Sequence, residues 1–467
     1  MYIEKFKKRL TDVLFYPKLC KYEDVIENVP QYLELLNRRS INGIDGLVIY
    51  IHVPFCNRFC FYCSYFKEPL SHYDYYARKK YFEAICKELR MYKNFEHFKT
   101  KKVKAIQFGG GTPSLVEPDF LRMVIQEIKE NFNCAECELI TMEGNPASLL
   151  KDEKLEAFYD IGVQRLSIGV QTFNKELRKK LLIESTVEQI YEVTEKINKI
   201  GYRDYSMDLM YNLPGEKVQQ VVDDIQEMDK LGPKFIDIYS LNIFPNTKFK
   251  EVIDKGNYFK EKPSEEKNIL MTASVINTFK ELKYNQVMSF TYSKEETKTP
   301  PHVDYFFNGG SVLGLGPSSR SYLDGVNFRN VPDVKKYMSM IDKGEYPIDC
   351  GMLVSKEEQD RKKMVFFPLY LVQDKSELED IQIYRSTIDR LKELGYISED
   401  DKYLHITEEG KKWTGNIATC FFSQKEKAKH NISFLKSMKE NENPYNQDAM
   451  GVSMEKRRKW KNDWDCL

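Results

Sequence analysis

The stretch Ile49-Tyr-Ile-His-Val-Pro-Phe-Cys-Asn-Arg-Phe-Cys-Phe-Tyr-Cys63 decides the fold of this chain. It holds three thiols, Cys56, Cys60 and Cys63, in the spacing Cys-x3-Cys-x2-Cys. Thiolates are the usual ligands of iron–sulfur clusters. A four-iron cube takes one ligand per iron, and the next cysteine along the chain is only Cys86. The stretch therefore predicts a [4Fe–4S] cluster with one iron left open for a small chelating cofactor.

Two other uses of these thiols are less favoured. Structural zinc needs four ligands, and the pair Cys134 and Cys137 could supply the missing ones. Disulfides are typical of secreted chains, but residues 1–14 are charged and lack the apolar segment of a signal peptide. We therefore expect a reducing cytoplasm, with the cysteines outside the stretch present as free or buried thiols.

Composition limits the function classes. A chain of 467 residues suggests two or three domains, and 42% hydrophobic with 30% charged residues is ordinary for a globular protein. A formal net charge of zero argues against nucleic acid as a partner. No apolar run approaches the roughly 20 residues of a membrane helix, so no integral membrane contact is expected.

Strand and helix patterns alternate after the first strand, 47–53. Further strands are expected at 103–108, 138–143, 165–169, 205–210 and 236–241, with helices near 73–92, 117–131, 150–160, 186–200 and 217–231. This spacing is typical of βα units with a parallel sheet. It predicts an α/β fold, a partial (β/α)6 barrel whose site lies at the carboxyl ends of the strands, where every unusual segment falls.

The domain boundaries expected from these patterns are a helical arm over 1–45, the barrel over 46–250, and a barrel extension with a substrate-side segment over 251–353. In the extension, helix is expected at 263–282 and strand at 286–292 and 311–315. A helix, a short β-wing and a helix from residue 408 predict a small winged-helix-like module over 354–424. It carries no basic stripe, which favours a lid or scaffold over a DNA reader. A charged tail occupies 425–467.

Several segments together carry a family resemblance. They are Tyr50-Ile-His-Val-Pro-Phe-Cys56, Phe108-Gly-Gly-Gly-Thr-Pro-Ser114, Glu143-Gly-Asn-Pro146, Arg165-Leu-Ser-Ile-Gly-Val-Gln171, Asp208-Leu-Met-Tyr-Asn-Leu-Pro214, Gly314-Leu-Gly316 and Ile406-Thr-Glu-Glu-Gly410. In this order they resemble the radical S-adenosylmethionine (SAM) superfamily, in its oxygen-independent coproporphyrinogen III oxidase-like branch. Relatives in that branch include the anaerobic oxidase, a haem chaperone, anaerobic haem-utilisation enzymes and radical SAM methyltransferases.

The resemblance implies the cofactors and their contacts. Cys56, Cys60 and Cys63 would hold the cluster that cleaves SAM to a 5′-deoxyadenosyl radical. The residues that would contact SAM are Tyr50, Tyr62, Gly110, Gly111, Thr112, Glu143, Gln171, Asp208 and Met210. A carboxylate can accept two hydroxyl hydrogen bonds from a ribose, and a glutamine can both donate and accept, which agrees with these roles. An electron donor such as a flavodoxin or a ferredoxin is the implied protein partner.

The implied substrate is a tetrapyrrole, with haem as a candidate further ligand. Two differences from the family pattern argue against the prediction that this chain decarboxylates coproporphyrinogen. The anaerobic oxidase has a cysteine where this chain has Tyr65, and an arginine of the family corresponds to Ile183 here. The segment around His302, Phe306 and Phe307 takes the place of a histidine-containing run in the haem chaperone. The expected function is a radical SAM oxidoreductase acting on a porphyrin or haem. A methyltransferase or haem-degrading enzyme that uses two SAM, and a haem chaperone, remain open.

Overall fold

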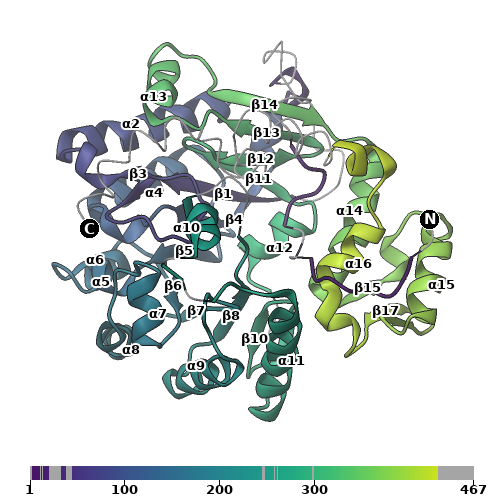
Figure 1. The fold of residues 1–467 in the computed structure, drawn as a ribbon. Coiled ribbons are helices and arrows are strands. Elements are labelled where there is room, and N and C mark those ends of the chain that lie inside the picture. The colour runs from purple at the N-terminus through teal and green to yellow at the C-terminus, as the bar shows by residue number, and fades with distance from the viewer. Residues whose placement is uncertain are drawn as a thin grey trace.

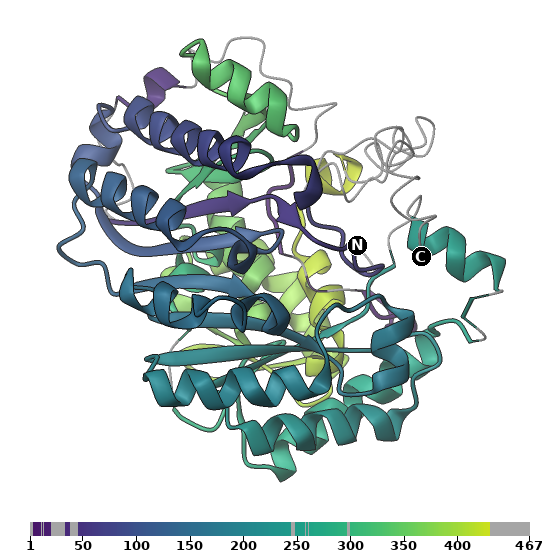
Figure 2. The same ribbon diagram turned by 90° about the vertical axis from the view of Figure 1, so that its left-hand side faces the viewer.

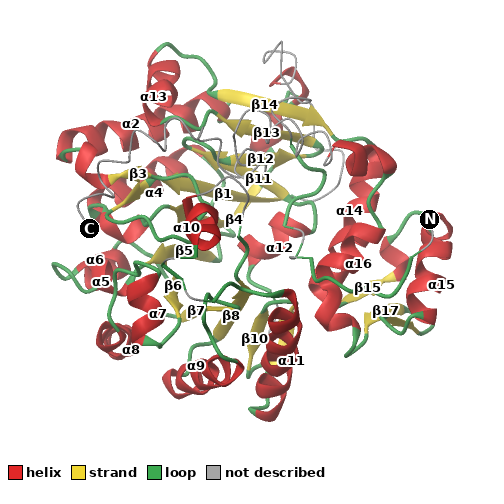
Figure 3. Cartoon of the chain, in the orientation of Figure 1, coloured by secondary structure: helices red, strands yellow, loops and turns green. Residues whose placement is uncertain are grey.

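The computed structural model describes residues 3–10, 12, 14–19, 33–37, 45–243, 248–256, 258–259, 261–296 and 299–429. Six parallel strands, each hydrogen-bonded to the next, form its centre (Figure 3). They are β1 (Gly46–Val53), β4 (Lys102–Gly110), β5 (Leu139–Gly144), β6 (Arg165–Gln171), β7 (Asp204–Tyr211) and β8 (Phe235–Ser240). The predicted α/β fold with six βα units is confirmed, and the strand bounds agree within two residues.

Helices connect these strands and cover one side of the sheet (Figures 1 and 2). Local signals set their ends: Thr186 and Gln189 form a capping box at the start of one helix, and Gly201 ends it with a φ of 88°. None of the helices in the described part of the chain is long and apolar enough to cross a bilayer. The helices are α2 (Tyr75–Tyr92), α3 (Glu96–Lys99), α4 (Pro118–Asn131), α5 (Pro146–Leu149), α6 (Lys154–Asp160), α7 (Lys175–Lys180), α8 (Val187–Ile200) and α9 (Val218–Leu231).

Later strands extend the sheet at both edges. Beside β1 lie β11 (Ser311–Leu315), β12 (Arg320–Leu323), β13 (Val326–Asn330) and β14 (Ile348–Leu353), and beside β8 lie β10 (Thr291–Ser293) and β9 (Asn285–Met288). The single strand expected over 286–292 is wrong. The Ser289 N–H donates to Leu369 O and the Ile238 N–H to Phe290 O, so outside partners hold a turn there. The helices of this part are α10 (Lys248–Lys255), α11 (Glu265–Glu281), α12 (Pro301–Phe307) and α13 (Val334–Asp342).

The C-terminal elements pack around a second apolar cluster, which also takes in Ile3, Tyr16, Met288, Phe290 and Phe307, on the side of the sheet away from α2–α9 (Figure 1). They are α14 (Lys356–Tyr370), β15 (Val372–Asp374), α15 (Arg385–Glu393), β16 (Ile397–Glu399), β17 (Tyr403–Ile406) and α16 (Thr414–Cys420), with the strand order β15-β17-β16. A relation to winged-helix modules stays a prediction, as do the domain boundaries. Nearly all of the predicted charged tail lies outside the described residues.

The helical arm expected over 1–45 is wrong for residues 3–10 and 14–19, which contain no helix, whereas the described residues 33–35 are helical. Several of their backbone groups bond instead to side chains that are distant in the sequence, most of them in the C-terminal part of the chain. The Leu10 N–H donates to Asn416 Oδ1 at 2.9 Å, and Asn416 Nδ2 donates to Lys8 O at 2.9 Å. The ring of Phe6 stacks on Tyr396 with centroids 4.7 Å apart. We call residues 3–10 and 14–19 the N-terminal strap.

A buried carboxylate ties the first helix of the barrel to the extended sheet edge. Glu88 is completely buried and accepts hydrogen bonds from the Gly316 N–H at 2.9 Å, Asn330 Nδ2 at 2.7 Å and Tyr337 Oη at 2.6 Å. Burial outweighs these three donors and raises the pKa of Glu88 to about 7. The folded protein therefore holds a proton on Glu88 at pH values where the unfolded chain releases it.

Replacement of Glu88 by glutamine tests this directly. A raised pKa in the folded state means that the stability contributed by the proton is present below pH 4.5 and is lost as the pH rises through about 7. Relative to Glu88→Gln, the wild type should lose up to about 3 kcal/mol of unfolding free energy across that window. Urea unfolding of both proteins at several pH values measures the difference, and a difference independent of pH would refute the assignment.

Candidate functional site

One large cavity opens at the carboxyl ends of the parallel strands. Its volume is about 1270 Å³, above the roughly 300–1000 Å³ typical of a pocket for one small ligand. All the site residues predicted from the sequence line this cavity: Tyr50, Cys56, Cys60, Tyr62, Cys63, Gly110, Gly111, Thr112, Glu143, Gln171, Asp208, Met210, His302, Phe306 and Phe307. The structure thus brings residues from five of the six central strands, from the segments that follow β1 and β4, and from helix α12 to one place.

The three thiols lie on a loop that two short strands close. Strand β2 (Phe55–Cys56) pairs in parallel with β3 (Glu68–Pro69), and the Cys63 N–H donates to Cys60 O at 3.2 Å. Lys67 Nζ donates to Cys63 O at 2.9 Å, which places a cation beside the thiols. Burial raises the pKa of Cys56 to about 12, and the charge of Lys67 opposes that rise. Lys67 therefore favours thiolates, the form that binds iron.

The thiol geometry fits a cluster better than a single ion. Among the described residues, no group of three or more His, Cys, Asp or Glu side chains is arranged to hold one metal ion. A four-iron cube uses one thiolate at each of three corners, so its ligands stand further apart than those of zinc. Cys134 and Cys137 do not line the cavity; their sulfurs face Ile128 O and Leu139 O. The zinc alternative is not supported by these positions.

The glycine run joins the thiol loop to the next strand. The Gly111 N–H donates to Val53 O at 2.7 Å, and the Thr112 N–H donates to Phe55 O at 2.9 Å. A Cβ on Gly111 would lie 2.8 Å from Phe55 O, closer than real Cβ atoms come to backbone. Glycine is therefore required for this close approach. Thr112 Oγ1 also lies 3.5 Å from Cys56 Sγ.

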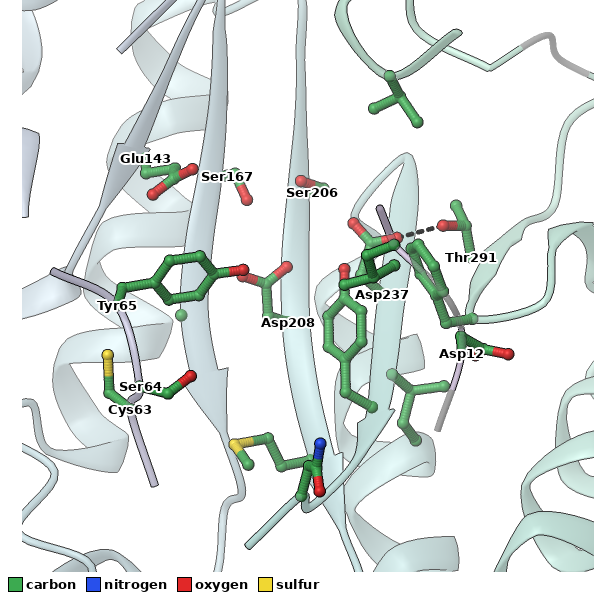
Figure 4. A pocket seen from close by; sticks show the side chains of 18 of the residues that line it. Asp12, Cys63, Ser64, Tyr65, Glu143, Ser167, Ser206, Asp208, Asp237 and Thr291 are labelled. Carbon is green, nitrogen blue, oxygen red and sulfur yellow. Dashed lines mark hydrogen bonds between the residues drawn. The ribbon is translucent and has the colours of Figure 1, made fainter. Parts of the chain in front are cut away.

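Carboxylates from neighbouring strands meet beyond the glycine run. Glu143 Oε2 accepts from the Gly110 N–H at 3.1 Å, and burial raises the pKa of Glu143. Asp208 is hydrogen-bonded to Ser167, and its pKa is raised well above the ordinary value, first by burial and then by Asp237 and Glu143. Figure 4 shows these groups facing one space, with the hydroxyl of Tyr65 directed toward Asp208.

Sequence reasoning missed Asp237. It lies on β8 in register with Asp208 on β7, so both side chains point to the same side of the sheet. Thr291 Oγ1 on β10 donates a short hydrogen bond to Asp237 Oδ1 (Figure 4). The signal in the sequence is a lone acid inside an apolar strand, Phe-Ile-Asp-Ile-Tyr, at the position equivalent to Asp208. A charge in a buried strand indicates either a partner or a function.

The aromatic segment 302–307 lines the cavity only in part. His302 is 8% exposed and lines the cavity, and its Nδ1 atom finds no hydrogen-bond partner within the described residues. Phe306 and Phe307 line the cavity as predicted. Tyr305, which directly precedes them, does not: its ring packs against Gly46 and Gly310, which have no side chains to obstruct it.

Cationic side chains also line the cavity, and sequence reasoning missed them. They come from the N-terminal strap, the thiol loop and the segment after it, β6, β12 and the C-terminal part of the chain: Arg9, Lys18, Arg58, Lys67, Arg165, Arg320, Lys411 and Lys427. The strap falls within the helical arm expected over 1–45. Its contacts span more than 250 positions of sequence, as in the Arg9 N–H that donates to Glu265. No local pattern could have revealed them.

Replacement of the thiols tests the cluster site. Cys56→Ala, Cys60→Ala and Cys63→Ala should each reduce the iron of anaerobically reconstituted protein from about four atoms per chain to near none, because each sulfur binds one corner of the cube. Iron analysis and visible absorption measure the loss. The Cys134→Ala/Cys137→Ala double variant is the matched control and should keep the cluster; loss of iron in the control alone would show that the site is elsewhere.

Comparisons with known proteins agree with this geometry. Residues 50–228 match the family model of the radical SAM superfamily. The haem chaperone HemW of Lactococcus lactis is 31% identical over 291 residues, which cover 62% of this chain and 73% of the relative. The oxygen-independent coproporphyrinogen III oxidase of Helicobacter pylori is 22% identical over 429 residues, 87% of this chain and 92% of that protein.

A solved structure shows the same fold. The coproporphyrinogen III oxidase HemN of Escherichia coli superposes with a TM-score of 0.74 and 19% identity, covering 87% of this chain and 96% of that chain. The chain therefore belongs to the radical SAM superfamily, in the branch that contains the oxygen-independent coproporphyrinogen III oxidases and the related haem chaperones, and its cofactors are a [4Fe–4S] cluster and S-adenosylmethionine.

Proposed function

We propose that this protein binds a tetrapyrrole beside SAM and converts it by radical chemistry. The observation that carries the proposal is a single cavity of about 1270 Å³ that is lined by the three thiols, by the expected SAM contacts and by further aromatic and cationic side chains. The cavity is larger than one small ligand requires. Relatives whose names refer to haem or coproporphyrinogen support a tetrapyrrole as the second ligand.

The roles of the residues follow from their positions. When bound, the cluster supplies the electron that cleaves SAM to a 5′-deoxyadenosyl radical. Cys56, Cys60 and Cys63 hold the cluster, and the loop closed by β2 and β3 shields it. Glu143, fixed by the Gly110 N–H, faces the position of the SAM amino group. Gln171, the last residue of β6, can donate and accept hydrogen bonds at the ribose hydroxyls, and the carboxylate of Asp208, within β7, can accept them.

The SAM site differs from the family pattern at one position. Ile183, where the family arginine is expected, lines the cavity but offers no charge or hydrogen bond. The nearby Arg178 does not replace it: its guanidinium donates to Val170 O at 2.6 Å, Thr172 O at 2.7 Å and Ser185 O at 2.5 Å. Arg178 is therefore occupied in holding the loop after β6, and SAM binding depends more on Glu143 and Asp208.

The aromatic and cationic part of the cavity lining suits a tetrapyrrole. Such a ligand has a flat apolar ring and peripheral carboxylates, so it needs aromatic walls and cations. Phe290, Phe306 and Phe307 supply rings, and Arg9 supplies a guanidinium from the N-terminal strap. The negative charge of Asp12 and Glu265 helps to raise the pKa of Arg9, so its guanidinium stays charged despite burial.

A haem chaperone is the second candidate. It is favoured by His302, whose pKa is lowered well below the ordinary value by burial and by the charge of Arg165, so the imidazole is neutral. Neutral imidazole is a common ligand of haem iron. The Lactococcus lactis relative is named for this role. In this candidate the protein releases haem unchanged, and an electron donor such as a flavodoxin or a ferredoxin is required only for SAM cleavage.

Substitutions at the SAM contacts test the first half of the proposal. Glu143→Ala, Gln171→Ala and Asp208→Ala should each weaken SAM binding by about ten- to a hundred-fold, because each removes a buried hydrogen bond worth roughly 1.5–3 kcal/mol. The cluster absorption should remain, since none of the three contacts iron. Equilibrium binding of SAM measures the change, with Asp223→Ala on the outer helix α9 as control; unchanged affinity in all three variants would remove them from the site.

The products of anaerobic incubation separate the two candidates. Protein, SAM and a low-potential reductant are combined with coproporphyrinogen or with haem, and mass spectrometry follows both SAM and the tetrapyrrole. A modified ring together with 5′-deoxyadenosine supports the enzyme, whereas haem recovered unchanged supports the chaperone. For the chaperone, His302→Ala should also shift the Soret band of bound haem, because the imidazole ligand determines that spectrum. If no tetrapyrrole binds, the second half of the proposal fails.

A further inference from the structure

The thiol loop has an inner face toward the cavity and an outer face toward solvent. Every second residue from 56 to 62 lines the cavity: Cys56, Arg58, Cys60 and Tyr62. The residues between them do not line it, and of these Asn57 is exposed and Phe59 is partly exposed. Because consecutive Cα atoms are about 3.8 Å apart, the outer face is one thickness of backbone away from the thiols. It is therefore a short route for an electron from outside the molecule to the cluster.

Helix α7, which directly follows β6, ends beside this loop. The Phe61 N–H donates to the carbonyl oxygen of Leu181, the residue after the helix, at 3.4 Å. One residue further on, Leu182 O lies 3.8 Å from Cys60 Sγ. The last turn of α7 is thus attached to the part of the loop that holds a cluster ligand.

The exposed side of that last turn is cationic. Leu177 and Arg178 point inward and are buried, whereas Lys179 and Lys180 are exposed. Neither lysine forms an ion pair with any residue in the part of the chain that the structure describes, in contrast to Lys175 at the start of the helix, which pairs with Glu188. Their charges are therefore available to a partner in solution.

The local charge balance is positive although the whole chain is neutral. Residues 56–63 and 172–188 contain five cations and three acids: Arg58, Lys175, Arg178, Lys179 and Lys180 against Glu176, Glu184 and Glu188. One of the acids, Glu184, already accepts a hydrogen bond from Asn57 Nδ2 at 3.1 Å. Complementary charge steers weak encounters between proteins and raises their association rate, so this surface favours an acidic partner.

We propose that Asn57, Phe59, Lys179 and Lys180 form the surface on which an acidic electron-carrier protein docks to reduce the cluster. For a flavodoxin, the anionic flavin hydroquinone gives up one electron and becomes the neutral semiquinone, the oxidised cluster gains that electron, and no proton moves. The lysines match carboxylates of the carrier, and the ring of Phe59 gives an apolar contact close to the thiols. This inference goes beyond the proposed function, because it depends on the cluster and not on the tetrapyrrole.

Charge reversal on α7 tests the docking surface. The double variant Lys179→Glu/Lys180→Glu should weaken binding of an acidic flavodoxin to the anaerobically reconstituted protein by about ten-fold at low salt, because two attractive contacts become repulsive. Calorimetry with the oxidised flavodoxin measures this affinity. Stopped-flow absorbance should show that flavodoxin hydroquinone reduces the cluster more slowly by a similar factor. Added salt should narrow both differences, because it screens surface charge.

The control reverses two charges elsewhere. Lys129 and Lys199 are exposed and lie in the last turns of α4 and α8, as Lys179 and Lys180 do in α7. These two helices lead into β5 and β7, so they end where the strands begin, away from the thiols. Lys129→Glu/Lys199→Glu should therefore bind flavodoxin as the wild type does. Reduced methyl viologen, a small cation that needs no docking surface, should reduce the cluster of both double variants at least as fast as that of the wild type.

The other outcomes would overturn the inference. Equal losses of flavodoxin binding in both double variants would show an effect of net charge alone. Unchanged binding in Lys179→Glu/Lys180→Glu, or a wild type that neither binds flavodoxin nor is reduced by it, would exclude this surface. Slower reduction by methyl viologen in Lys179→Glu/Lys180→Glu would place the defect in the cluster. The proposed function is judged separately, by the tetrapyrrole products formed with methyl viologen as the electron source.

Discussion

The pairing of the thiol loop with the glycine run is the constraint on which the site depends. Two backbone hydrogen bonds, from Gly111 to Val53 O and from Thr112 to Phe55 O, lock the end of β1 to the end of β4. The same turn presents the Gly110 N–H to Glu143 and the Thr112 hydroxyl to Cys56. A side chain on Gly111 would collide with backbone. The proposed cluster ligands and cofactor contacts are therefore positioned by one close approach of two strands.

Parallel register then extends this arrangement around the barrel. Glu143 on β5, Asp208 on β7 and Asp237 on β8 end up facing one space because neighbouring parallel strands align their carboxyl ends. The burial of three carboxylates is costly, which explains their raised pKa values and the hydroxyls of Ser167 and Thr291 beside them. This energetic cost of burial is acceptable in a binding site, because ligands with N–H, O–H and ammonium groups stabilise the buried carboxylates.

Much of this could be predicted from the sequence, for physical reasons. Apolar runs of strand length and the spacing of βα units predict the six strands. Short motifs near their carboxyl ends predict Cys56, Glu143, Gln171 and Asp208 as site residues. The predictions that failed concern segments whose structure depends on contacts between residues far apart in the sequence. The strap is extended because its backbone bonds to α16 and its neighbours, some 400 positions away, as for Leu10 and Asn416. Asp237 and Arg9 have no local motif, and only the folded chain brings them to the cavity.

The most direct test of the account is an anaerobic crystal structure of the reconstituted protein with SAM and a tetrapyrrole. The account predicts three ligands in one cavity: the cluster on Cys56, Cys60 and Cys63, SAM against Glu143 and Asp208, and the tetrapyrrole against Phe306 and Phe307. A porphyrin bound outside this cavity, or a second SAM in the place assigned to it, would contradict the account.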